Sequence, residues 1–244
     1  MHEAQMHDAN SFVTLTYRDE DCPVSLQYRH FQLFMKRLRR SNRNVRFYMC
    51  GEYGEEFGRP HYHAILFGKF FADREPLADY AAGQVLYRSA ELEKLWPHGF
   101  SSIGDVTFDS AAYVARYVMK KVTGDRAEAH YLRETQSGQL VSVSPEFGQM
   151  SRRPGIGATW FEKFGSDVFS ITRDGCRIGS VERKAPRFYD KCLAKVDPDR
   201  VEDLELRRYN KITPEVVAEN EPERLAVRQV VAQARLAFKK RSLG

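Results

Sequence analysis

The first part of the chain alternates between segments with strand patterning and segments with helix patterning. Residues 12–17, Phe-Val-Thr-Leu-Thr-Tyr, are rich in β-branched and aromatic side chains and stop at a polar run that contains Pro23, which predicts a strand. The next segment repeats its apolar residues at the i, i+3, i+4, i+7 spacing of one helical stripe: Phe31, Phe34, Met35 and Leu38. This spacing predicts an amphipathic helix within residues 28–46.

Two further strand patterns surround a turn-rich segment. Val45–Glu52 and His61–Phe67 are separated by eight residues, Tyr53–Pro60, which include two glycines and a proline. Strands joined by such a short loop pair antiparallel. The simplest register places Glu52 opposite His61.

Three more elements follow the hairpin and determine the expected fold class. A short helix is expected around Ser89–Trp96, then a strand over Phe100–Phe108, then a helix capped by Asp109 or Ser110. The resulting order, β-α-β-β-α-β-α, suits an α+β fold in which helices pack on one face of a central antiparallel sheet. We therefore expect an α+β protein with flanking helices.

The rest of the chain is less regular. Glu223–Arg241 has helix patterning, and the composition becomes charged and aliphatic from Asp199 onward. We divide the chain into a core at 1–125, an irregular extension packed on it at 126–198, and a charged helical segment at 199–244. No internal repeat is present.

Composition narrows the class of protein without identifying a partner. The chain has 244 residues and a net charge of +5, and 42% of its residues are hydrophobic, which is enough for a folded core. No apolar stretch approaches the roughly 20 residues that cross a bilayer, and the first residues lack signal-peptide features, so we expect a soluble intracellular protein. The charge is unevenly distributed, because residues 28–46 hold seven cations and no acid.

The sharpest local feature is the run His61-Tyr62-His63. Side chains alternate between the faces of a strand, so the two imidazoles project to the same side and could converge on one divalent cation. Glu52, in the register given above, would add a carboxylate on that face. Such a set suits Mg²⁺, Mn²⁺ or another first-row ion, whereas chance spacing of the histidines and an ordinary ion pair for Glu52 are the alternatives.

A second feature is the helical segment that begins at Ala111. On a helical wheel Val114, Ala115, Val118 and Val122 gather near Ala111 and form the expected core face. Tyr113, Arg116, Tyr117 and Lys120 fall on the other side. Tyr113 and Tyr117 would therefore present two phenols side by side, with the Lys120 ammonium favouring the phenolate, unless the pair is simply exposed.

Together these features are the parts of a DNA strand-transfer site. A cation can polarise a phosphate, and a tyrosine oxygen that attacks it stores the phosphodiester bond energy as a phosphotyrosine. Two tyrosines permit two successive transfers.

The same residues resemble a known family. The triplet at His61, residues 12–17 and the pattern Tyr113-x-x-x-Tyr117-x-x-Lys120 resemble the three motifs of the rolling-circle replication initiators called HUH endonucleases. The hairpin, the helix near Phe34 and the string Ser-Arg-Arg-Pro-Gly-Ile-Gly at 151–157 are most similar to the replication initiation proteins of gokushovirus-type microviruses, which are phages with single-stranded DNA.

This resemblance implies a fold, an activity and partners. The fold would be the ferredoxin or RRM-like arrangement of HUH endonucleases, with Glu52, His61 and His63 holding Mn²⁺ or Mg²⁺. Tyr113 or Tyr117 would cut the origin, leaving a 5′-phosphotyrosine and a free 3′-OH, with Lys120 in support. Host helicase and polymerase would act with it in the cytoplasm of the infected bacterium, since the sequence has no G-x-x-x-x-G-K-[ST] motif.

The strand of origin DNA is expected to lie across the sheet. The cations expected to contact its phosphates are Lys36, Arg37, Arg39, Arg40 and Arg116. The alternatives are a plasmid initiator, relaxase or transposase with the same chemistry, a non-catalytic single-stranded DNA-binding domain, or a metalloprotein unrelated to DNA.

Overall fold

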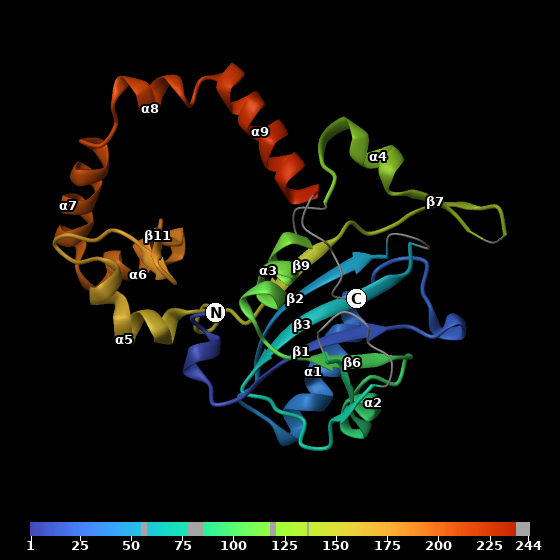
Figure 1. The fold of residues 1–244 in the computed structure, drawn as a ribbon. Helices are drawn as coiled ribbons and strands as arrows, with labels where there is room; N and C mark the ends of the chain where they lie inside the picture. The colour runs from blue at the N-terminus through green and yellow to red at the C-terminus, as the bar shows by residue number, and fades with distance from the viewer. Residues whose placement is uncertain (55–57, 78–84, 118–120, 136, 238–244) are drawn as a thin grey trace. The chain divides into compact units, whose positions relative to one another are not determined.

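The chain forms two compact units, which are described separately. The computed structural model describes residues 1–54, 58–77, 85–117, 121–135 and 137–237 (Figure 1). The first unit ends at Ile156 and the second begins at Gly157. The sequence placed boundaries at 125/126 and 198/199 instead. Residues 126–156 belong with the first unit because they include a strand of its sheet.

The first unit is built on an antiparallel sheet of seven strands in the order β4-β5-β6-β1-β3-β2-β9. Its strands are β1 (Asn10–Thr16), β2 (Arg46–Tyr53), β3 (Pro60–Phe67), β4 (Glu75–Pro76), β5 (Tyr87–Arg88), β6 (Ser101–Gly104) and β9 (Phe147–Met150). The predicted α+β fold with a central antiparallel sheet is confirmed.

A βαββαβ unit supplies the centre of this sheet. Helix α1 (Tyr28–Ser41) follows β1, and α2 (Ala90–Leu95) precedes β6. The four strands lie in the order β6-β1-β3-β2, the fourth, first, third and second along the chain, as in ferredoxin-like folds. The predicted short helix is confirmed, and the Ser89 hydroxyl caps it by accepting a hydrogen bond from the amide of Leu92.

Both of these helices cover one face of the sheet. The predicted apolar stripe of α1 is buried there against alternate residues of β1, β2 and β3, with Trp96 from the end of α2 in the same core. The stripe consists of Phe31, Phe34, Met35 and Leu38. The polar side of α1 faces away from the sheet.

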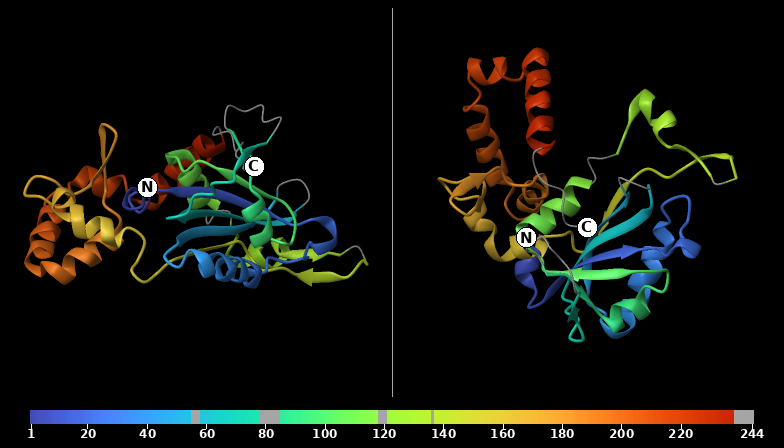
Figure 2. Two further views of the ribbon diagram at one scale, coloured as in Figure 1. Left: turned by 90° about the horizontal axis from the view of Figure 1, so that it is seen from below. Right: turned by 45° about the vertical axis from the view of Figure 1, so that its right-hand side comes forward.

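Helix α3 (Phe108–Tyr117) lies on the opposite face, so the expectation that all helices pack on one face is wrong (Figure 2). It begins earlier than predicted, because the Thr107 hydroxyl accepts a hydrogen bond from the amide of Ser110 at 3.1 Å. The Ser110 hydroxyl accepts one in return from the amide of Thr107 at 2.8 Å. Thr107, rather than Asp109 or Ser110, therefore caps the helix.

The buried side of α3 also differs from the prediction. Val114 is buried as expected, but Ala115 is exposed and Tyr113 is buried beside Phe12 of β1. Turning Tyr113 rather than Ala115 toward the sheet removes more apolar surface from water. Val118 lies outside the described residues.

The remaining elements are short. The first unit also contains 3-10 turns at Ala4–Met6, Asp19–Asp21 and Gly124–Arg126, helix α4 (Ala127–His130) and the hairpin β7 (Leu132–Glu134) and β8 (Leu140–Ser142). The second unit contains α5 (Ala158–Val168), β10 (Cys176–Ile178), β11 (Val181–Arg183), α6 (Arg187–Val196), α7 (Pro198–Tyr209), α8 (Pro214–Ala218) and α9 (Pro222–Ala237). Helix α9 confirms the predicted C-terminal helix, whose residues 238–241 lie outside the described part. None of the described helices is long and apolar enough to cross a membrane.

Tyr62 joins strand β3 to the start of α1. Its hydroxyl donates a hydrogen bond to the carbonyl of Gln27 and accepts one from the amide of the same residue, both at 2.9 Å. It also lies 3.0 Å from the hydroxyl of Tyr17. Tyr62 is fully buried, so each of these groups depends on it for a partner.

We predict that Tyr62→Phe lowers the free energy of unfolding by about 1–3 kcal/mol, because it leaves buried polar groups without a partner. Urea unfolding followed by circular dichroism measures the change. Tyr209→Phe removes the same hydroxyl from a side chain that is 71% exposed, and its effect should stay below about 0.5 kcal/mol. Equal effects of the two substitutions would contradict the role given to Tyr62.

Candidate metal centre

The hairpin of β2 and β3 brings two histidines and a glutamate together on the α3 face of the sheet. The observed register pairs Glu52 with His61 and Cys50 with His63, as the sequence predicted for Glu52. Tyr62, between the histidines, points to the opposite face, where it joins the core under α1. Strand alternation thus separates the structural residue of the triplet from its two polar neighbours.

The three side chains converge closely. One carboxylate oxygen of Glu52, Oε1, lies 2.9 Å from Nε2 of His61 and 3.0 Å from Nε2 of His63. One ligand atom from each residue lies within 4.8 Å of the others, and this is the group of three such residues found in the described part of the chain. Glu52 and His63 are each 1% exposed, so the group lies under the surface with His61 at its more open side.

The hydrogen bonds of His61 require a positive charge beside Glu52. Nδ1 of His61 lies 3.0 Å from the carbonyl oxygen of Arg59, which can only accept, so Nδ1 carries a proton. Nε2 then presents its lone pair to the Glu52 carboxylate unless the ring is doubly protonated. Either a second proton or a metal cation satisfies both atoms, so the donor set fits a divalent cation.

A second layer of contacts orients His63. Its Nδ1 lies 2.9 Å from the hydroxyl of Thr14, and the ring of Phe12 stacks on it at 5.7 Å between centroids. Hydrogen bonding at Nδ1 directs Nε2 toward the cation position, as outer-shell groups do in metal sites. The sequence prediction missed Thr14 and Phe12, although both lie in the first predicted strand, because the pairing of β1 with β3 is not local.

The two imidazoles determine the charge state of Glu52. Burial alone would raise the pKa of its carboxyl group, but hydrogen bonds and charge interactions with His61 and His63 outweigh burial and lower the pKa to about 2. The carboxylate is therefore ionised at neutral pH. A negative charge this well buried needs a cation close to it.

Helix α3 places one of the predicted tyrosines directly over this group. The ring of Tyr113 packs edge-on against the ring of His63, with 5.1 Å between centroids. It also contacts Phe12 in an edge arrangement at 6.4 Å. Tyr113 is 5% exposed, so it is neither remote from the sheet nor an exposed aromatic.

The other predicted site residues are distributed unevenly. Tyr117 ends α3 one turn after Tyr113, and Arg116 lies on the same helix, half-buried. Lys120 lies outside the described residues. The structure brings Arg116 to the face of the histidines but leaves the cations of α1 on the other face: Lys36, Arg37, Arg39 and Arg40.

Two of these α1 cations also have structural partners. Arg37 donates to the carbonyl of Leu95 at 2.8 Å, and Arg39 donates twice to the carbonyl of Val45, at 2.9 and 3.1 Å. The basic helix is therefore not part of the group around His63. The sequence could not show this, because the face on which a helix packs depends on non-local contacts.

Comparison with known proteins places this fold among phage proteins. Residues 10–122 match the family described as replication-associated protein ORF2. The replication-associated protein VP4 of Bdellovibrio phage phiMH2K is 32% identical over 209 residues, which cover 82% of this chain and 62% of that protein. The replication-associated protein ORF4 of Chlamydia phage 1 is 39% identical over 129 residues, 49% of this chain and 32% of that protein.

A third relative is the replication-associated protein ORF2 of Spiroplasma virus 4, 31% identical over 202 residues, 76% of this chain and 58% of that protein. The chain thus spans between about a third and about three fifths of the length of these relatives. No solved structure matches it.

We predict that Glu52→Gln weakens Mn²⁺ binding more than about 10-fold, because a neutral amide replaces the one anionic ligand and loss of even an outer-shell partner costs that much. Electron paramagnetic resonance of free Mn²⁺ during a titration measures the affinity. Glu128→Gln is the matched control, since Glu128 is exposed on α4 and should leave the affinity unchanged. Wild-type affinity in Glu52→Gln would show that these side chains do not hold the ion.

Proposed function

The domain at residues 10–122 belongs to the replication-associated protein ORF2 family, and from this premise we propose that the chain is a metal-dependent endonuclease for single-stranded DNA. It would nick the origin of a phage genome to initiate rolling-circle replication, and rejoin the strand to end it. The observation that carries the proposal is the packing of Tyr113 on His63, beside Glu52 and His61.

Glu52, His61 and His63 would hold one divalent cation. One carboxylate and two imidazoles suit Mn²⁺ or Mg²⁺ acting as a Lewis acid, and three protein ligands leave positions for a phosphate oxygen and water. When bound, such a cation neutralises and polarises the scissile phosphate. Thr14 and the Arg59 carbonyl keep the two imidazoles oriented through their Nδ1 atoms.

Tyr113 would supply the attacking oxygen. A bond forms between its phenolic oxygen and phosphorus, and the bond between phosphorus and the 3′ oxygen breaks. The phenol gives up its proton, and the departing 3′ oxygen takes up one as it becomes the 3′-OH. The phosphate stays attached to Tyr113 and to the 5′ end of the other fragment, so a later attack by a free 3′-OH can restore the strand.

Tyr117 would serve the second transfer, because it lies one helical turn after Tyr113 on the same helix. Lys120, from the same motif, would stabilise the phenolate or the charge that develops on the phosphate. Arg116 would contact a neighbouring phosphate of the strand. The cations of α1 do not share this task in our proposal, since they lie on the other face of the sheet.

The partners follow from this chemistry. The 3′-OH released by the nick can prime a polymerase, and the sequence lacks a nucleotide-binding loop for unwinding, so host polymerase and helicase would complete the reaction in the bacterial cytoplasm.

Covalent trapping tests this function. In the presence of Mn²⁺ and phage-origin single strands, the wild-type protein should form an adduct with DNA on a denaturing gel. Tyr113→Phe should reduce the adduct at least about 10²-fold and the double substitution with Tyr117→Phe should abolish it, because the nucleophile is lost. Tyr48→Phe is the control, because Tyr48 lies on the same face of β2 and its adduct should be unchanged.

The same gel separates the alternatives. An undiminished adduct in the double variant would contradict the tyrosine mechanism. Origin binding by the wild type with no adduct on any origin strand would indicate a non-catalytic single-stranded DNA-binding domain. Adduct formation that is unaffected by a chelator would remove the role of the cation.

A further inference from the structure

A basic groove lies at the edge of the sheet, around the start of β2 and the end of β9. Its volume is about 760 Å³, and five arginines and no acidic residue are among the residues that line it. The residues used below are Tyr28, Arg39, Arg43, Arg46, Arg152 and Arg153, which we call the arginine groove. Arg152 and Arg153 come from the string at 151–157, to which the proposed nuclease chemistry gives no role.

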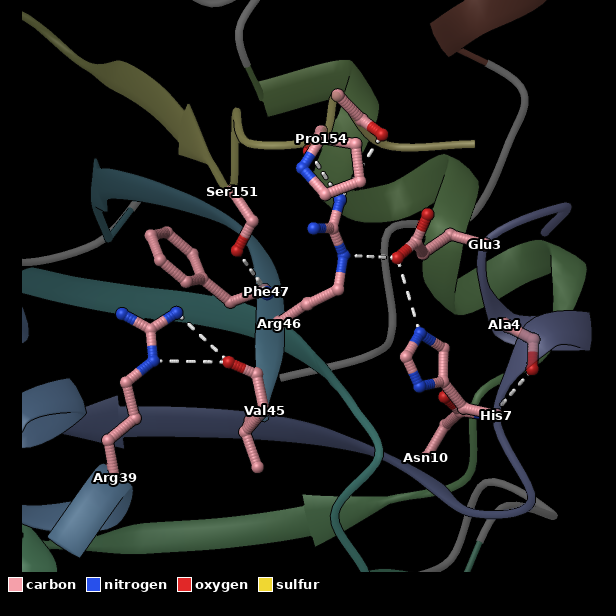
Figure 3. Close-up of polar contacts among 11 residues, drawn as sticks. Glu3, Ala4, His7, Asn10, Arg39, Val45, Arg46, Phe47, Ser151 and Pro154 are labelled. Carbon is pink, nitrogen blue, oxygen red and sulfur yellow. Dashed lines mark hydrogen bonds and ion pairs between the residues drawn. The ribbon is translucent and has the colours of Figure 1, made fainter. Parts of the chain in front are cut away.

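Two of the arginines hold the walls of the groove together (Figure 3). Arg46 pairs with the buried carboxylate of Glu3 and donates to the carbonyl of Pro154 at 2.7 Å. Arg39 is fixed on the carbonyl of Val45 and lies over the ring of Phe47. These contacts connect the N-terminal segment, the loop before β2 and the segment after β9, so the groove is a built feature of the first unit.

The remaining three arginines are available to bind an anion. Arg43, Arg152 and Arg153 are exposed, and none of them has an acidic partner within the part of the chain that the structure describes. Arg152 donates to the neutral amide of Gln149, at 3.2 Å. Three guanidinium groups in one groove repel one another, so a polyanion that passes between them gains from all three.

The basic surface continues along α1. A second hollow of about 520 Å³ shares Tyr28 and Arg39 with the arginine groove. It adds Arg29, Lys36 and Arg40. The two hollows together form a path of cations longer than a single phosphate, which favours an extended polyphosphate backbone over a small anion.

The aromatic rings in the arginine groove indicate which form of DNA fits. Phe47 is buried beneath Arg39, and the ring of Tyr28 packs edge-on against Phe147 at 5.5 Å. Proteins that bind single strands stack the bases on open aromatic faces, and both rings that line this groove are already packed. A duplex presents phosphates and keeps its bases stacked inside, so it matches a surface of guanidinium groups.

We infer that the arginine groove binds the phosphate backbone of double-stranded DNA beside the nicking site. Arg46 begins β2 and Glu52 is six residues further along, so at about 3.3 Å per residue the groove lies roughly 20 Å from the candidate metal centre. That length corresponds to about six base pairs. The inference rests on the proposed function for its biological setting, but the binding itself can be measured without any cleavage.

Fluorescence anisotropy with a labelled duplex of unrelated sequence tests the groove on the full chain. Relative to wild type, Arg43→Gln/Arg152→Gln/Arg153→Gln should bind the duplex at least about 10-fold more weakly near 0.1 M salt. The slope of log affinity against log salt should become about 3 units shallower, because three phosphate contacts are lost. Cleavage of a short single strand that covers only the nick should keep its wild-type rate.

The control removes the same charge elsewhere. Lys94→Gln/Arg126→Gln/Lys163→Gln changes three exposed, scattered cations outside the groove and should bind the duplex like wild type. Thermal unfolding confirms that both variants are folded. An equal loss in both variants would overturn the groove, and a loss confined to single strands would overturn the assignment to duplex DNA. A wild-type protein that binds the duplex but cuts no strand would contradict the nuclease proposal alone.

Discussion

The antiparallel pairing of β2 with β3 is the constraint on which the candidate site depends. With Glu52 opposite His61, alternation turns both histidines and the carboxylate toward α3 and turns Tyr62 into the core under α1. A slip of one residue would exchange these faces and bury the imidazoles among apolar side chains. The hydrogen bonds of Tyr62 to Gln27 oppose such a slip, because they can form only when Tyr62 points toward α1.

Features set by neighbours in the chain could be predicted from the sequence, and features set by distant contacts could not. The stripe of α1 and the hairpin register are local, since each follows from spacing and loop length. The orientation of α3 depends on how Tyr113 fits against Phe12 and His63, which lie far away in the sequence. For the same reason the pattern gave no indication that Thr14 would orient His63, or that α1 and α3 would cover opposite faces.

The charge of the chain acquires a different meaning once it is placed on the fold. Seven cations gather in residues 28–46, yet Arg37, Arg39 and Arg46 are partly used for internal contacts with carbonyl oxygens and Glu3. The face of the candidate metal centre carries few cations among the described residues, and the exposed ones lie along α1 and the arginine groove. Chemistry and electrostatic attraction are thus located on different surfaces of the same sheet.

Strand β9 has a protective consequence for the whole first unit. It covers the outer edge of β2 from Tyr48 to Gly51, and the ring of Phe147 lies 3.1 Å from the position that a side chain on Gly51 would take. A fragment that stopped at residue 125, the boundary drawn from the sequence, would lack this strand. The open backbone groups of β2 would then be available for pairing with other chains, so such a fragment would tend to aggregate through the very strand that carries Glu52.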